Sequence, residues 1–175
     1  MHLANYLGLL HQSELELAKA LLEVAEAHGH EPDVRVLCLR FADQSAAHAD
    51  ALAPFLERYG EDKPDEPERL HSDLFDGSRS GGLGLLRDLH DLYLMAAECE
   101  VTWALVGQAA QGARDRDLLE VVQRCDGEVA AQLKWLRTRM KQAAPRRCWW
   151  PTDQPEARAS RRSTVASGVR SLPMR

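Results

Sequence analysis

Proline and glycine divide this chain of 175 residues into four long stretches, and no proline lies between Pro67 and Pro145. Within each stretch the apolar residues recur at three- and four-residue steps, the spacing that places them on one face of an α-helix. No segment alternates polar and apolar residues as a half-buried strand does. The pattern predicts an all-α fold with helices over about residues 3–28, 32–59, 83–111 and 114–142.

The lengths of the connections select an arrangement for these helices. Only a few residues join the first helix to the second and the third to the fourth, and short links make neighbouring helices antiparallel. About 23 residues separate the second helix from the third, enough for the chain to travel the length of a bundle. We therefore expect a four-helix bundle of two antiparallel hairpins joined by a long crossover, with a short helix near residues 68–75.

Charge separates the folded part of the chain from its C-terminal end. The formal net charge is −5, but residues 144–175 hold seven Arg and two carboxylates, so this tail carries +5 and residues 1–143 carry −10. An acidic domain argues against nucleic acid as a partner. We predict a bundle over residues 1–143 and a basic, disordered tail over residues 144–175, which leaves open a docking partner for the tail.

The sequence also favours a cytoplasmic protein without a membrane partner. No apolar stretch approaches the roughly 18 residues of a membrane-spanning helix, and the first residues lack the features of a secretory signal. The four cysteines show no C-x-x-C spacing, and three of them lie within apolar helical patterns. Reduced core thiols are the expected state of such cysteines.

The predicted helix over residues 83–111 is apolar on nearly every side. A four-helix core hides only part of the circumference of each helix, so some of this apolar surface would face solvent in a monomer. We therefore expect a homodimer that buries part of the outer face of this helix.

Ionisable residues interrupt the apolar faces of the predicted helices. Glu14 shares a heptad position with Leu7 and Leu21, and His48 lies between two phenylalanines in the same way. Glu14 and His48 lie at levels of the first hairpin that differ by only roughly 3 Å at 1.5 Å per residue. We expect these two side chains to be in direct or water-bridged contact.

Glu100 and Glu128 occupy a similar common level on the second predicted hairpin. A buried carboxylate without a partner costs several kcal/mol, on the order of 2–7 for an unsatisfied polar group and more for a charge. Each inward-facing pair therefore implies a counter-charge, a shared proton or a metal ion.

With these residues, the chain resembles the ferritin-like superfamily over about residues 3–142, including small bacterial ferritin-like proteins. Di-iron members supply one Glu from each of two helices and a Glu-x-x-His from each of the other two. Ser45 and Ala131 stand where this motif has a Glu and a His. The positions that match the motif are Glu14, His48, Glu100 and Glu128.

The resemblance implies a metal-binding protein, for iron or another divalent ion, in metal handling or stress response. Because two of the six expected ligands are absent, it implies at most one tightly bound ion per chain. The competing interpretation is a metal-free structural or protein-interaction bundle in which Glu14 and His48 form a buried pair. Whether the protein is an enzyme stays open. His28 and His30, at the first bend, are expected to be solvated.

Overall fold

The computed structural model describes residues 2–60 and 74–149, and within these ranges the chain is helical without any strand. The predictions of an all-α fold and of four long helices are confirmed, with bounds that differ by a few residues. The elements are α1 (Leu3–Ala27), α2 (Pro32–Gly60), α3 (Gly81–Ala113), α4 (Arg116–Ala144) and the π-helical turn η1 (Pro145–Trp149).

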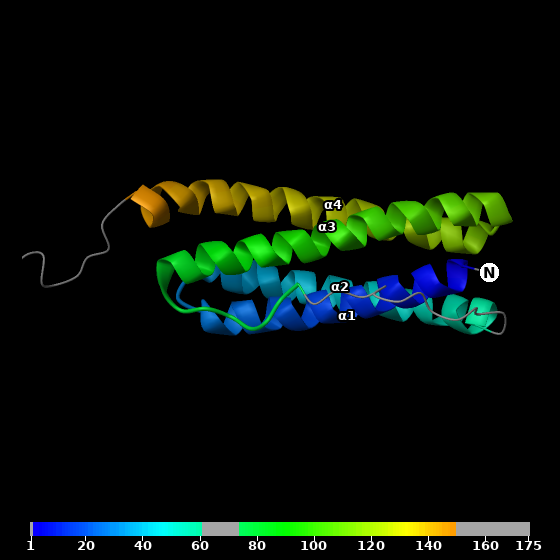
Figure 1. The fold of residues 1–175 in the computed structure, drawn as a ribbon, viewed down its shortest axis with the longest axis horizontal. Coiled ribbons are helices and arrows are strands. Elements are labelled where there is room, and N and C mark those ends of the chain that lie inside the picture. The colour runs from blue at the N-terminus through cyan, green and yellow to red at the C-terminus, as the bar shows by residue number, and fades with distance from the viewer. Residues whose placement is uncertain (1, 61–73, 150–175) are drawn as a thin grey trace, which may run out of the picture.

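The four helices lie lengthwise in one bundle (Figure 1). Helix α1 packs against α2, α3 packs against α4, and α3 also packs against α1, so α3 has a neighbour on each side. The short helix expected near residues 68–75 falls mainly outside the described residues, and residues 74–80 are not helical. In the described residues, no helix has the length and apolar character needed to cross a membrane.

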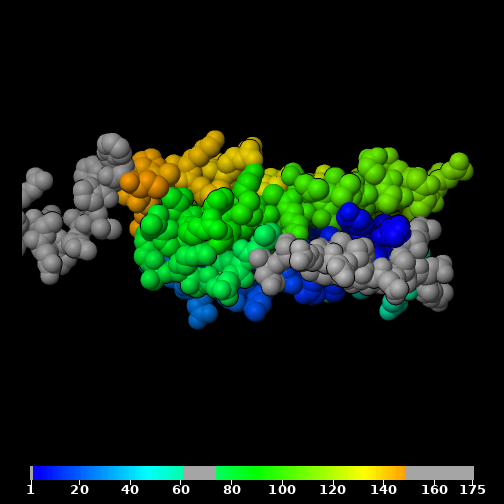
Figure 2. Space-filling view, viewed as in Figure 1, coloured from blue at the N-terminus to red at the C-terminus, as the bar shows by residue number. Residues whose placement is uncertain are grey.

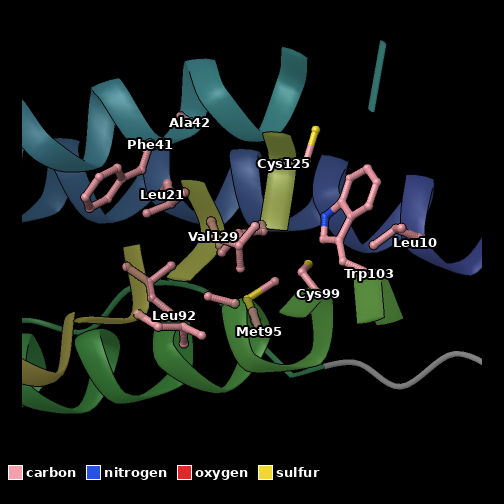
Figure 3. Close-up of a cluster of buried hydrophobic side chains, with 14 of the residues drawn as sticks. Leu10, Leu21, Phe41, Ala42, Leu92, Met95, Cys99, Trp103, Cys125 and Val129 are labelled. Atoms are coloured by element: carbon pink, nitrogen blue, oxygen red, sulfur yellow. The ribbon is translucent and has the colours of Figure 1, made fainter. Parts of the chain in front are cut away.

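Apolar side chains from all four helices fill the space between them (Figure 3). Cys38, Cys99 and Cys125 are buried within this core as free thiols, whereas Cys148 is free and exposed. Burial raises the pKa of Cys38 to about 12 and that of Cys125 to about 11, so neither forms a reactive thiolate near neutral pH. The expectation of unpaired core thiols is confirmed.

The first residues of the predicted tail, Pro145–Trp149, form the helical turn η1. Helix α4 continues into η1, and Arg147 donates a hydrogen bond of 2.6 Å to Glu31 at the bend between α1 and α2. This ion pair joins residues far apart in the chain, so local composition carried no sign of it. The expected disorder and docking role of residues 150–175 lie outside the described residues.

Gly84 allows the segment before α3 to pack closely on that helix. A Cβ atom at Gly84 would lie 2.9 Å from the carbonyl carbon and oxygen of Arg79. Because backbone must move to make room, we expect Gly84→Ala to lower the free energy of unfolding by about 1–3 kcal/mol in urea denaturation. Gly127 in α4 has no atom within 4 Å of such a Cβ. Gly127→Ala should instead stabilise by about 0.5–1 kcal/mol, and equal effects of the two changes would contradict this packing.

Candidate functional site

Two of the predicted site residues meet inside the bundle. His48 Nδ1 of α2 lies 3.1 Å from Glu14 Oε1 of α1, and the two side chains are 3% and 0% exposed. The expected contact between Glu14 and His48 is confirmed. It arises because both residues occupy core positions of neighbouring helices at one level, as their heptad spacing indicates.

The second ring nitrogen of His48 faces another carboxylate. His48 Nε2 lies 3.1 Å from Glu128 Oε2 of α4, whose side chain is 41% exposed. We call the chain of Glu14, His48 and Glu128 the relay. An imidazole with a carboxylate at both nitrogens is complementary to the doubly protonated, positively charged form, which donates from both.

Helix α3 completes the relay through a tryptophan. Trp103 Nε1 donates a hydrogen bond of 2.7 Å to Glu14 Oε1. The Trp103 and His48 rings also meet edge to face, with 5.9 Å between their centroids. Figure 3 shows Trp103 inside the core beside Leu10. All four helices therefore contribute one side chain to this polar centre.

The sequence analysis did not identify Trp103 as a functional residue, because a tryptophan on the apolar face of a helix is normally a core residue. The available signal was its indole N–H, since a buried indole usually has a hydrogen-bond acceptor. Glu14 was the buried acceptor that the sequence already placed in the interior.

Glu100 does not join the relay. It lines a surface pocket of about 250 Å³ between α3 and α4. Glu128 instead contacts His48 of α2. Within the described residues, the side chains of Glu100 and Glu128 therefore have different surroundings. Similar height along a hairpin does not fix the rotation of each helix. Other residues that line the pocket of Glu100 are Tyr93, Lys134, Arg137 and Lys141.

The donor set of the relay does not fit a di-iron centre. Across residues 2–60 and 74–149, no three or more His, Cys, Asp and Glu side chains are grouped so that they could hold a metal ion. In the relay the imidazole lies between the two carboxylates, so Glu14 and Glu128 approach different nitrogens. On α3, Trp103 brings an N–H donor to Glu14, and an indole N–H has no lone pair for a metal.

The relay predicts a pH dependence of stability. Burial lowers the pKa of His48, but the hydrogen bonds and charges of Glu14 and Glu128 outweigh burial and raise it above its ordinary value of 6.5. A group whose pKa is higher in the folded state stabilises the fold most at pH values below its unfolded-state pKa. This contribution is lost as the pH rises through its folded-state pKa. The advantage of the wild type over His48→Gln should therefore shrink as the pH rises from 6.5, the ordinary pKa, through the raised pKa of His48.

Urea denaturation across that pH range measures this difference. Exposed His30 supplies the control, because His30→Gln removes an imidazole at the surface and should leave the pH profile of the wild type unchanged. Parallel profiles for the wild type and His48→Gln would show that the charge of His48 does not stabilise the fold.

A second buried polar cluster lies at the bend between α1 and α2 and holds the end of the crossover. His28 Nε2 lies 2.8 Å from Asp88 Oδ2, and these side chains are 1% and 0% exposed. Arg79 donates to Asp88 from both its backbone N and Nη1, and to Asp91 from Nη1, each at 2.8 Å. We call these four residues the crossover clasp.

The expectation that His28 is solvated is wrong, because His28 is buried and contacts Asp88 of α3, whereas His30 is exposed as expected. The sequence did contain a signal for the clasp. Asp88 and Asp91 are acidic residues in a mainly apolar helix, and such residues require partners when they face the interior.

Comparison with known proteins identifies no relative of this chain. No family model, no curated protein and no solved structure matches the chain. The relay and the arrangement of the helices are therefore the basis for assigning a function.

Proposed function

We propose that this chain is a ferritin-like bundle of two antiparallel hairpins in which a polar relay replaces the metal centre, and that it acts as a metal-free protein-interaction module. The ferritin-like arrangement is supported by two short connections and one long crossover between four helices. The observation that carries the metal-free function is the pairing of both ring nitrogens of His48 with carboxylates.

The relay gives the buried carboxylate of Glu14 a counter-charge without a bound cation, and Glu128 is partly exposed to solvent. A protonated imidazole supplies the positive charge that buried Glu14 needs, and Trp103 supplies a further donor to the same carboxylate. Because the three members of the relay and Trp103 come from four helices, the relay also favours one register of the bundle over others. Buried polar groups have this role in some helical assemblies.

A single divalent ion, iron or another metal, is the second candidate and would indicate a role in metal handling. Two fully buried oxygens, Glu14 Oε2 and Ser45 Oγ, have no hydrogen-bond partner, which favours an additional ligand in the interior. His48 Nε2 and Glu128 would hold the ion, while Glu14 would orient the imidazole through Nδ1. Glu100, the fourth predicted ligand, lies in a separate pocket.

Metal counting on protein purified without an affinity tag distinguishes the two functions. We expect well below one ion per chain and no rise of the thermal midpoint with added ferrous iron, manganese or zinc. An ion at 100 times its Kd would add about 2.7 kcal/mol of stability, which a thermal scan detects. One ion per chain that is lost in Glu128→Gln would instead establish the metal-handling function.

The interaction surface that supports this proposal lies on α3. Leu94, Val101 and Leu105 are 40%, 58% and 47% exposed. Burial of these side chains in a homodimer would remove apolar surface from water, which is the main favourable term in association. As part of the same proposal we place the protein in the cytoplasm, where its four free thiols would stay reduced.

A further inference from the structure

The exposed apolar residues of α3 form a continuous line along the helix. They recur at three- and four-residue steps, and two alanines in the line leave room for close approach of another helix. Figure 2 shows α3, in green, on the visible face of the molecule. We call this line the α3 stripe, and its members are the exposed Leu94, Val101, Ala104 and Leu105 and the half-buried Ala97.

A basic edge lies on the α4 side of the stripe. Lys134, Arg137 and Lys141 are exposed at consecutive turns of α4 and line the pocket between α4 and α3. Arg137 also stacks on the ring of Tyr93, with 5.2 Å from its guanidinium carbon to the ring centroid. Glu100 is the acidic residue among those that line this pocket. We call the three cations the basic rim.

An acidic edge lies on the α1 side of the stripe. Glu16 and Glu23 of α1 and Asp76 of the crossover line a pocket of about 400 Å³ between α1 and α3. Lys19 shares this pocket and lies 3.9 Å from Glu23 in an ion pair, so the pocket lining holds three carboxylates and one cation and is acidic on balance. We call the three carboxylates the acidic rim. The α3 stripe therefore runs between rims of opposite charge.

We propose that a second copy of this chain docks on the α3 stripe with its α3 parallel to that of the first copy. This inference rests on the proposed interaction function and names its partner. A two-fold axis along the helices brings each acidic rim to the basic rim of the partner subunit. A two-fold axis across the helices would bring like rims together, and like charges in an interface are unfavourable. The charge pattern therefore selects the parallel dimer.

Sedimentation equilibrium of the full chain tests the surface. We expect a dimer, and we expect Leu94→Glu or Val101→Glu to weaken it at least about thirty-fold, the loss typical of a central interface residue. Val36 of α2 is 63% exposed and lies outside the stripe, so Val36→Glu is the matched control and should remain dimeric. Circular dichroism confirms that each variant is helical.

A monomer at every concentration of the wild type would overturn the dimer. Metal counting would still decide separately whether the relay is metal-free, so failure of the dimer and failure of the metal-free relay are distinguishable.

Disulfide cross-linking tests the orientation. His90 and Gln108 are exposed positions of α3 that continue the line of the stripe at its two ends. They are 18 residues, or roughly 27 Å, apart along the helix. In a Cys148→Ser background, His90→Cys should cross-link to itself in the parallel dimer, and so should Gln108→Cys. Cross-linking only in a mixture of the two variants would establish the antiparallel dimer and overturn the proposal.

Charge reversal tests the rims themselves. Lys134→Glu with Lys141→Glu should weaken the dimer about tenfold, because four exposed ion pairs are lost across the two-fold axis. Adding Glu16→Lys and Glu23→Lys to the same chain should restore the Kd. A four-fold variant that stays as weak as the double variant would contradict the pairing of these rims.

Discussion

His48→Leu should lower the free energy of unfolding by about 3 kcal/mol at about pH 6, because it leaves the buried carboxylate of Glu14 without its cationic partner. The cost should be smaller at a second, higher pH, above the raised pKa of His48, because the wild type has then lost the charge that the variant lacks. Urea denaturation at the two pH values measures this difference. A loss that does not depend on pH would indicate that the variant fails only through poor packing.

The double variant Glu14→Leu with His48→Leu separates charge from packing. With both partners replaced by apolar side chains, no buried charge is left, and such replacements are often neutral or stabilising. Trp103 Nε1 would then lose its acceptor, at about 1–3 kcal/mol. We therefore expect the double variant to be more stable than His48→Leu alone at about pH 6. The reverse order would contradict a buried charge pair.

Asp88→Ala should cost about 2–3 kcal/mol, because the carboxylate accepts hydrogen bonds from both the backbone and the side chain of Arg79 and contacts His28. The side chain of Arg79 is 41% exposed, so its guanidinium can turn to water, which keeps the loss below that of a fully buried pair. Urea denaturation gives the stability.

Hydrogen exchange gives a local measure of the same change. The backbone N–H of Arg79 loses its acceptor in Asp88→Ala and should exchange faster than in the wild type. Asp117, whose side chain is 79% exposed in an ion pair with Arg58, supplies the control. Asp117→Ala should change stability by less than about 1 kcal/mol. Similar effects at both positions would contradict the clasp.

The sequence predicts the helices and the contact between Glu14 and His48 because both follow from the regular spacing of residues along each helix. Apolar residues at three- and four-residue steps define a buried face, and residues on two such faces at one level of a hairpin meet. The same rule does not decide where Glu128 points. That direction depends on how far α4 rotates about its axis, which the packing of all four helices sets.

The buried state of His28 depends on a contact that spans 60 residues, between the end of α1 and Asp88 of α3. The hydrogen bond from Trp103 to Glu14 spans 89 residues. No regular spacing in the sequence indicates side-chain pairs at such separations, because these pairs depend on how the helices pack in three dimensions. The sequence shows which residues need partners, and the fold selects the partners.

The protonation state of His48, measured by ¹⁵N NMR of the ring nitrogens, tests the metal-free relay most directly. At about pH 6, below the raised pKa of this side chain, we predict that both nitrogens carry a proton and that their signals stay unchanged when ferrous iron, manganese or zinc is added in equimolar amount. Loss of the proton from Nε2 with one metal ion bound per chain would contradict the account, because it would make His48 a metal ligand.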